Sequence, residues 1–191
     1  DPNGRVACET TVSTGLVHIM GEISTECYVD IPRIAREVIR EIGYDRAKYG
    51  FDCDTCGIIT NIDEQSGDIA LGVDKKGAGD QGMMFGYATK ETGKMLPLPF
   101  VLATEAIDSL QTRRHPALLP YAKAQVTYDY RRRRIDTFLI STQHKEDVEP
   151  DDVLHLCKRI MENVADAHHL NKDFRVLVNP TGRFVTGGSF A

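Results

Sequence analysis

Residues 5–23 read RVACETTVSTGLVHIMGEI, and this stretch decides the fold. Residues 5–12 and 16–23 are rich in the β-branched and apolar side chains typical of strands. Residues 13–15 (STG) between them have the length of a short hairpin connection. We therefore expect an antiparallel hairpin at the start of the chain.

An amphipathic helix is expected after this hairpin. Asp30 is suited to the N-cap, Pro32 falls in the first turn, and Gly43 stands where a C-cap glycine belongs. A single apolar stripe with helical spacing lies between them: Ile31, Ile34, Ala35, Val38, Ile39 and Ile42. Residues 56–62 then read as a strand, which completes a β-β-α-β unit.

The same order of elements occurs a second time. Residues 124–130 and 134–142 predict a hairpin, residues 153–164 a helix and residues 174–178 a strand. A further helix near residues 100–112 leads into this second unit. The pattern predicts an α+β fold, with repeated β-β-α-β units forming mixed sheets that carry helices on one face. The helix-free faces need a partner, so we expect the sheets to pack on each other or on a second subunit.

Composition excludes several classes of protein. The chain has 191 residues, 41% of them hydrophobic, which suits one or two globular domains. No apolar run could span a bilayer and no signal-peptide pattern is present, so we expect a cytoplasmic protein that does not bind membranes. The net charge of −5 argues against binding to nucleic acid. The basic run at residues 131–134 is interpreted as a solvated hairpin tip, with nucleic-acid binding as the weaker alternative.

The five cysteines do not form a recognisable metal or disulfide pattern. Cys53 and Cys56 have C-x-x-C spacing, but a zinc site needs a second pair of ligands. We interpret the cysteines as small apolar residues in a reducing compartment, with metal or redox use as the alternative.

Two glycine-rich features indicate a ligand. Residues 63–82 have little periodicity, and a long loop inside a compact chain is usually functional or disordered. Residues 77–82 within it read GAGDQG, in which glycines let the backbone approach a ligand closely. The carboxylate and the amide could then bind an ammonium group or ribose hydroxyls. A plain turn is the alternative.

Several motifs, taken together and in this order, resemble the S-adenosylmethionine synthetase (methionine adenosyltransferase) family over essentially the whole chain. They are residues 5–10 (RVACET), 21–23 (GEI), 65–69 (QSGDI), 77–89 (GAGDQGMMFGYAT), 141–144 (STQH) and 179–185 (NPTGRFV). The resemblance implies an enzyme that condenses ATP with L-methionine and then hydrolyses the tripolyphosphate. It also implies Mg²⁺ and K⁺ as cofactors. The active site would lie at the subunit interface of a homodimer, or of a homotetramer formed as a dimer of dimers.

The resemblance also divides the chain into three sections. Residues 1–74 would be a first αβ repeat of the central-domain type. Residues 75–94 would be an active-site loop and the connection to the third domain, and residues 95–188 would be a second αβ repeat.

Site residues follow from the same resemblance. Asp80 and Lys123 would be catalytic, Glu9 would bind potassium, and six residues would bind substrate or ATP: Glu22, Gln65, Asp80, Lys123, Arg183 and Phe184. A gating loop would comprise Gln65, Ser66, Gly67, Asp68, Ile69, Ala70, Leu71, Gly72, Val73, Asp74 and Lys75. The residues alone also allow a solvent-facing Glu9, an exposed Lys123 and a Phe184 in the core. We expect His144 to organise the structure by hydrogen bonding rather than to act in catalysis.

Some features of the family are missing. The motifs GHPDK and GDxGLTGRK and a third repeat are absent, so this chain alone is not expected to be active, whereas a longer protein containing it should be. The chain is also short between Val73 and Gly77, and residues 119–123 read LPYAK where the family has RPDAK. A non-catalytic nucleotide-binding or regulatory subunit is the alternative function.

Overall fold

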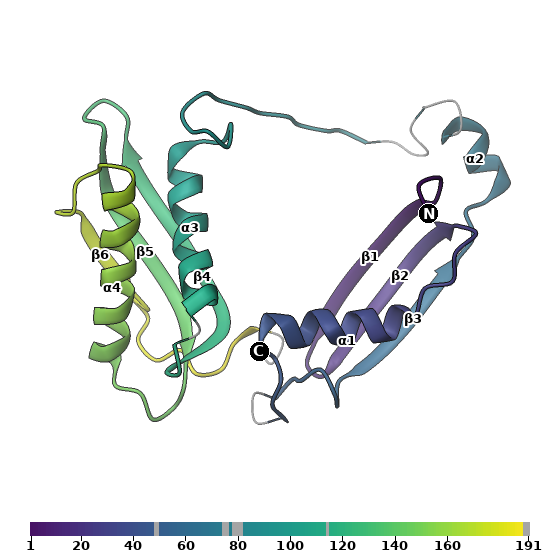
Figure 1. Cartoon of the computed structure of the whole chain (residues 1–191), viewed down its shortest axis with the longest axis horizontal. Helices are drawn as coiled ribbons and strands as arrows, with labels where there is room; N and C mark the ends of the chain where they lie inside the picture. The colour runs from purple at the N-terminus through teal and green to yellow at the C-terminus, as the bar shows by residue number, and fades with distance from the viewer. Residues whose placement is uncertain (48–49, 74–76, 78–81, 114, 189–191) are drawn as a thin grey trace. The chain divides into compact units, whose positions relative to one another are not determined.

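A computed structural model describes residues 1–47, 50–73, 77, 82–113 and 115–188. The chain divides into a first unit, residues 1–86, and a second unit, residues 87–188. Each unit contains one mixed sheet with helices on one face (Figure 1). The α+β class and the two repeats are therefore confirmed.

The first unit is built on the expected hairpin. Strand β1 (Arg5–Ser13) pairs antiparallel with β2 (Leu16–Ser24), which pairs parallel with β3 (Gly57–Asp63). Helix α1 (Ile31–Ile42) makes the crossover between β2 and β3 and covers one face of the sheet (Figure 1). The small core under α1 consists of six buried residues: Val17, Ile19, Ile39, Phe51, Cys53 and Cys56.

Both ends of α1 are set by the predicted residues. The Asp30 side chain accepts a hydrogen bond from the backbone N–H of Arg33 at 3.1 Å. Gly43 has φ of 112°, a left-handed conformation that glycine adopts at little cost, and its N–H bonds to the carbonyl of Arg40. The local sequence therefore sets where this helix begins and ends.

The expected loop at residues 63–82 is partly wrong. Residue 63 still belongs to β3, and Gly67–Val73 form a helix, α2. The Ser66 side chain accepts from the N–H of Asp68, the Ser66 carbonyl accepts from the N–H of Ala70, and Asp68 stabilises the positive end of the helix. Periodicity missed α2 because the helix is short and has no buried residue.

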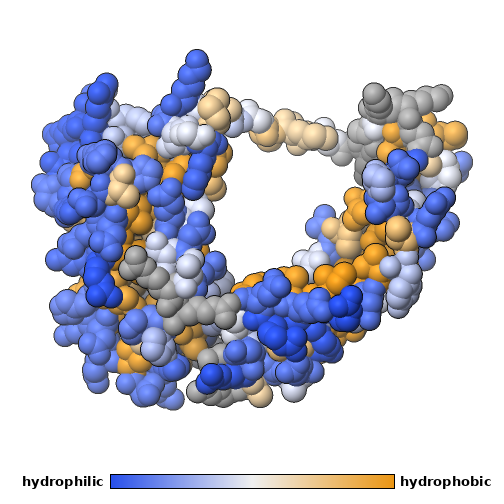
Figure 2. All heavy atoms as spheres, viewed as in Figure 1, coloured by the Kyte–Doolittle hydropathy of each residue, from blue (hydrophilic) through white to orange (hydrophobic). Residues whose placement is uncertain are grey.

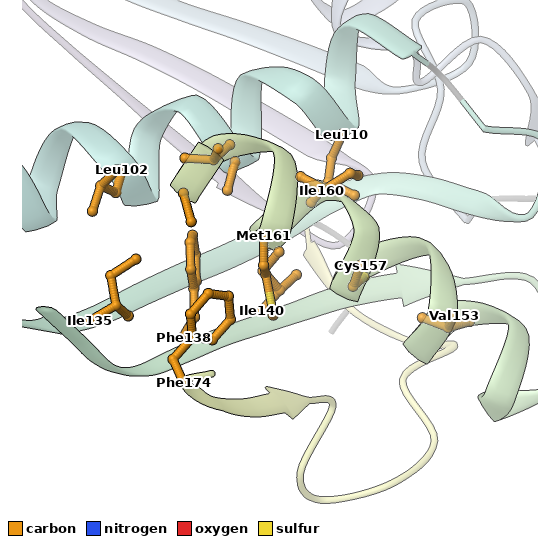
Figure 3. Close-up of a cluster of buried hydrophobic side chains, with 13 residues drawn as sticks. Leu102, Leu110, Ile135, Phe138, Ile140, Val153, Cys157, Ile160, Met161 and Phe174 are labelled. Carbon is orange, nitrogen blue, oxygen red and sulfur yellow. The ribbon is translucent and has the colours of Figure 1, made fainter. Parts of the chain in front are cut away.

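The second unit has two helices on its sheet. Strand β4 (Leu118–Asp129) pairs antiparallel with β5 (Arg134–His144), which pairs parallel with β6 (Arg175–Val178). Helices α3 (Leu98–Arg113) and α4 (Pro150–Ala167) share one core over this sheet. Phe138 and Ile140 of β5 meet Met161 and Cys157 of α4 in its centre (Figure 3).

Strand β4 begins six residues earlier than the sequence predicts. Leu118 already pairs with His144, and a register shift separates this pair from the next, Ala122 with Thr142. Pro120 lies at that irregularity, where a residue without an N–H is tolerated. At the other end of the hairpin, residues 131–133 are exposed, as expected for a solvated tip. Arg134 differs from that expectation, because it begins β5, is half-buried and pairs with Asp173 at 2.9 Å.

The predictions about the cysteines hold for most of them but not for all. Cys53, Cys56 and Cys157 are buried free thiols, whereas Cys27 is exposed and therefore does not serve as an apolar core residue. Within the described ranges, no helix has the length and apolar character that crossing a membrane requires.

Candidate functional site

The 141–144 and 179–185 motifs are joined by hydrogen bonds at the end of the second sheet. The Asn179 side chain accepts from the N–H of Thr142 at 2.8 Å and donates to the Thr142 carbonyl at 3.0 Å. The Gln143 side chain donates to the Val185 carbonyl at 2.8 Å. The asparagine amide thus continues the hydrogen-bonding pattern beyond the last residue of β6. Two segments far apart in the sequence are thereby held in one register.

His144 completes this joint. Its backbone N–H donates to the Phe184 carbonyl at 2.9 Å, and its ring Nε2 accepts from the Phe184 N–H at 3.1 Å. The ring Nδ1 lies 2.8 Å from the carbonyl of Lys145. His144 is 4% exposed, so these contacts are shielded from water. The expected organising role of His144 is confirmed.

Phe184 lies against a second aromatic ring that the sequence analysis did not assign. Its ring centroid is 6.0 Å from that of Tyr121 in an edge-to-face arrangement. Lys123 Nζ is 5.4 Å from the Tyr121 centroid, within the range of a cation–π contact. A Cβ on Gly187 would lie 2.4 Å from Cε2 of Phe184, so only glycine leaves room for the ring there. Phe184, Tyr121 and Lys123 form what we call the aromatic platform.

Arg183 extends the positive charge beside the platform. Its Nη2 is 2.5 Å from Oε1 of Glu146, in an ion pair whose two side chains are 62% and 79% exposed. Exposed pairs of this kind contribute little to stability, so the guanidinium can exchange Glu146 for another anion at small cost. Three of the predicted residues, Lys123, Arg183 and Phe184, therefore lie in one region of the second unit.

Two predicted carboxylates share the helix-free face of the first sheet. Ala7 pairs with Glu22 and Glu9 pairs with Met20, so all four side chains leave the sheet on the face opposite to α1. Glu22 also pairs with Asp63 on β3, which places a third carboxylate on this face. Glu9 is exposed and Glu22 half-buried.

Gly21 shapes the strand beside Glu22. Its φ is 141°, and a Cβ there would lie 2.1 Å from the carbonyl oxygen of Ala7. The glycine of the 21–23 motif is therefore required by the close approach of β1.

The predicted gating loop is only partly described. Gln65 precedes α2, and its Oε1 is buried without a hydrogen-bond partner within the described part of the chain. The N–H of Gly77 donates to the Gly72 carbonyl at 3.1 Å, which ties the end of this segment back to α2. Asp80, and with it Asp74 and Lys75, lies outside the described residues. The assignments of Glu9, Glu22, Gln65, Asp80 and Lys123 to substrate, catalysis or metal therefore stay predictions.

A cluster of three charged or ionisable groups in the second unit lies away from the predicted site residues. His168 Nε2 is 2.7 Å from Oε2 of Glu105, and Lys94 Nζ is 3.3 Å from its Oε1. Partial burial by itself would raise the pKa of Glu105, but the hydrogen bonds and charges of His168 and Lys94 outweigh it and lower that pKa. This cluster borders a groove between α3 and α4 and includes none of the predicted site residues.

The predicted metals find no complete site in the described ranges. There, no group of three or more His, Cys, Asp or Glu side chains could hold a metal ion. Glu9 could supply one oxygen ligand, and the remaining ligands would have to come from other residues or another chain. Metal binding through Glu9 alone is therefore not supported by this geometry.

Sequence reasoning missed Tyr121 and the bridging side chain of Asn179. The signal for Tyr121 was present, because an aromatic residue stands two positions before the predicted Lys123. The role of Asn179 depends on the register of β5 and β6, which a single sequence does not give. Conversely, a common pocket for Glu22 of the first unit and Phe184 of the second stays a prediction.

Comparisons with known proteins agree with these motifs. Residues 1–67 match the N-terminal domain of S-adenosylmethionine synthetase, and residues 75–184 match its central domain. The first repeat thus matches the model of the N-terminal domain, whereas the sequence analysis expected a domain of the central type.

Two curated relatives are the S-adenosylmethionine synthases of Clostridium acetobutylicum and of Clostridium botulinum strain Alaska E43. Each is 50% identical over 210 residues, which cover 98% of this chain and 54% of the relative. The chain thus spans about half the length of these relatives. The matched stretch of 210 residues is longer than the 191 residues here, so the relatives carry internal residues that this chain lacks. The matches at both the domain and the residue level show that the chain belongs to the S-adenosylmethionine synthetase family.

Proposed function

We propose that this chain is part of a methionine adenosyltransferase that makes S-adenosylmethionine from ATP and L-methionine and hydrolyses the tripolyphosphate. Family membership supports the reaction. The observation that carries the proposal is the aromatic platform, in which the half-buried Phe184, held by backbone hydrogen bonds, packs against Tyr121 and the Lys123 ammonium lies over the Tyr121 ring. Arg183 precedes Phe184 in the chain. An aromatic ring next to two cations suits a nucleobase joined to phosphates.

The reaction asks little acid–base chemistry of the protein. A lone pair on the methionine sulfur attacks C5′ of the ribose while the C5′–O bond breaks and the triphosphate leaves with the bonding electrons. Because sulfur is already nucleophilic, the enzyme must align the two reactants and stabilise the leaving group. Phe184 would hold adenine, and Lys123 and Arg183 would neutralise phosphate charge.

The first unit would serve methionine. Glu22 presents a carboxylate on the helix-free face, where it could bind the ammonium group, and Gln65 and Asp80 would contribute further polar contacts. The segment from Gln65 to Lys75, which contains α2, would act as the gate. A helix without buried residues is suited to movement, because it gives up no core contacts when it shifts.

Mg²⁺ and K⁺ belong to the proposal as cofactors of the intact enzyme. Bound Mg²⁺ would supply charge stabilisation at the phosphates. Glu9 would contribute an oxygen ligand for K⁺. We assign no reaction step to either ion, because the described residues do not form a complete site for one.

A homodimer, or a dimer of dimers, in the cytoplasm completes the proposal. The helix-free faces carry the predicted residues Glu9, Glu22 and Lys123. A subunit that covers such a face would bury these side chains next to its own residues, as expected for an active site shared between subunits.

A non-catalytic nucleotide-binding subunit is the second candidate. It is favoured by one observation, the internal residues of the relatives that this chain lacks. Titration calorimetry separates the two, because this candidate predicts that ATP binds and that no S-adenosylmethionine forms.

The direct test is an assay of the intact protein with ATP, methionine, Mg²⁺ and K⁺, following S-adenosylmethionine and phosphate. Phe184→Leu should raise the KM for ATP about tenfold, since a stacked ring contributes roughly 1–3 kcal/mol. The matched control is Phe100→Leu, an exposed phenylalanine on α3, which should change KM less than twofold. Asp80→Asn should lower turnover by orders of magnitude and leave folding nearly unchanged. Absence of product from the intact protein under every condition would end the proposal.

A further inference from the structure

His144 has both ring nitrogens engaged with the backbone. Nε2 is 3.1 Å from the nitrogen of Phe184, and Nδ1 is 2.8 Å from the carbonyl oxygen of Lys145. A backbone N–H can only donate and a carbonyl can only accept. The partners therefore require a neutral ring with its proton on Nδ1 and a free lone pair on Nε2.

This tautomer fixes the backbone of Phe184 from both sides. The Phe184 N–H donates to the His144 ring, and the Phe184 carbonyl accepts from the His144 N–H at 2.9 Å. Gly187, which is buried, leaves room for the phenylalanine ring next to this grip. Neither hydrogen bond involves the Phe184 ring, which packs edge to face with Tyr121.

We propose that His144 is a positioning residue for the nucleotide, which sets the affinity for ATP by holding Phe184 and Arg183 without touching the ligand itself. This inference rests on the proposed function. It goes further, because it makes the affinity for adenine depend on His144, which lies outside the aromatic platform, having its proton on Nδ1.

A merely structural histidine would behave differently, and two substitutions separate the cases. His144→Asn keeps a donor near the position of Nδ1 for the Lys145 carbonyl but removes the acceptor for the Phe184 N–H. His144→Gln keeps an acceptor near the position of Nε2 but removes the donor for Lys145. Each variant thus loses one buried hydrogen bond, and only the first releases Phe184.

The proposal expects an asymmetric result with the intact protein. His144→Asn should raise the Kd of ATP in calorimetry, and the KM for ATP, about tenfold, the size of effect expected when a buried N–H loses its partner. The KM for methionine should stay within about twofold. His144→Gln should keep the Kd of ATP within about threefold. Because each variant loses one buried hydrogen bond, the melting temperatures of the two variants should fall by similar amounts.

A second measurement does not depend on either variant folding. Nitrogen NMR of the His144 ring in the unmodified protein should show a protonated Nδ1 and an unprotonated Nε2, with and without ATP. Protonation at Nε2 would overturn the proposal, and so would equal loss of ATP affinity in the two variants. If the unmodified protein binds ATP but makes no S-adenosylmethionine, the proposed function fails while the ATP affinities still decide the role of His144. If it binds no ATP, both fall.

Discussion

The two units repeat one β-β-α-β design but bury it to different extents. The second sheet is covered by α3 and α4, and its core contains thirteen buried residues. In the described part of the first unit, α1 is the helix that packs on the sheet, and the core contains six buried residues. Because α3 lies over β4 (Figure 1), the apolar residues on the helix side of this strand are at least half-buried. The matching side of the first unit leaves apolar residues of α1 and β1 exposed: Val6, Val12, Ile34, Val38 and Ile42.

Figure 2 shows this apolar surface beside α1. Exposed apolar patches of this kind mark places where another surface packs. A β-β-α-β repeat therefore does not bury its whole sheet by itself. In the second unit, α3, the helix that precedes the hairpin, provides the additional burial. We infer that the first unit has the lower local stability, and that the carboxylates on its sheet depend on further contacts for their placement.

The largest expected difference between the units is in thiol reactivity. Burial raises the pKa of Cys157 in the second unit to about 12, whereas Cys27 in the first unit is exposed. Because Cys157 is buried and its raised pKa keeps the thiol protonated at pH 8, Cys27 should react with a disulfide reagent faster by orders of magnitude. Stopped-flow absorbance of two variants, one that retains only Cys27 and one that retains only Cys157, measures the two rates. Comparable rates would show that the second core opens readily.

The raised pKa of Cys157 also has a consequence for stability. The folded protein keeps the Cys157 thiol proton at a pH where the unfolded chain has lost it. The contribution of this thiol to the free energy of unfolding is therefore complete below pH 8 and is lost progressively from about pH 9 to about pH 12. The free energy of unfolding should fall as pH rises through this window, and Cys157→Ala should reduce that dependence.

Glycine substitutions sharpen the comparison of the two units. Gly21→Ala should lower the free energy of unfolding by about 3 kcal/mol or more, because its φ is 141° and the new methyl would collide with the carbonyl oxygen of Ala7. The matched site in the second unit is Gly182, with φ of 96° and no atom within 4 Å of the new methyl. Gly182→Ala should therefore cost only the backbone strain, about 1 kcal/mol. Urea titrations compare the two, and equal losses would contradict the close approach at Gly21.

The smallest expected difference is at the helix starts. The Asp30 side chain caps α1, whereas Glu149 at the same position of α4 makes no side-chain capping bond. Asp30→Ala should cost about 1 kcal/mol, while Glu149→Ala should be nearly neutral. Thermal unfolding of both variants tests this, and an equal drop in melting temperature would mean that packing rather than capping defines α1.

The sequence predicted those parts of the fold that are determined locally. The hairpin of β1 and β2, the caps of α1 and the acidic start of α4 all follow from neighbouring residues, and each is present. The early start of β4 was missed because Pro120 hides a strand whose pairing is set by β5. Helix α2 was missed because its residues bury nothing and so leave no periodic pattern.

The candidate site divides along the same line. Motifs identified Lys123, Arg183 and Phe184, and the structure brings them together around Tyr121. What holds them is a set of hydrogen bonds between residues about forty positions apart, such as Gln143 with Val185. Contacts of that range depend on the register between strands, which no local pattern encodes.

All three strands of the first sheet precede the strands of the second in the sequence, and this has a consequence for synthesis. A ribosome releases every strand of the first sheet before it makes any residue of the second. The first hairpin can therefore form and be joined by β3 while translation continues. The exposed apolar residues of α1 and β1 would then be accessible to chaperones while the second unit is still being synthesised. The less buried unit is therefore the one that stays exposed longer during translation.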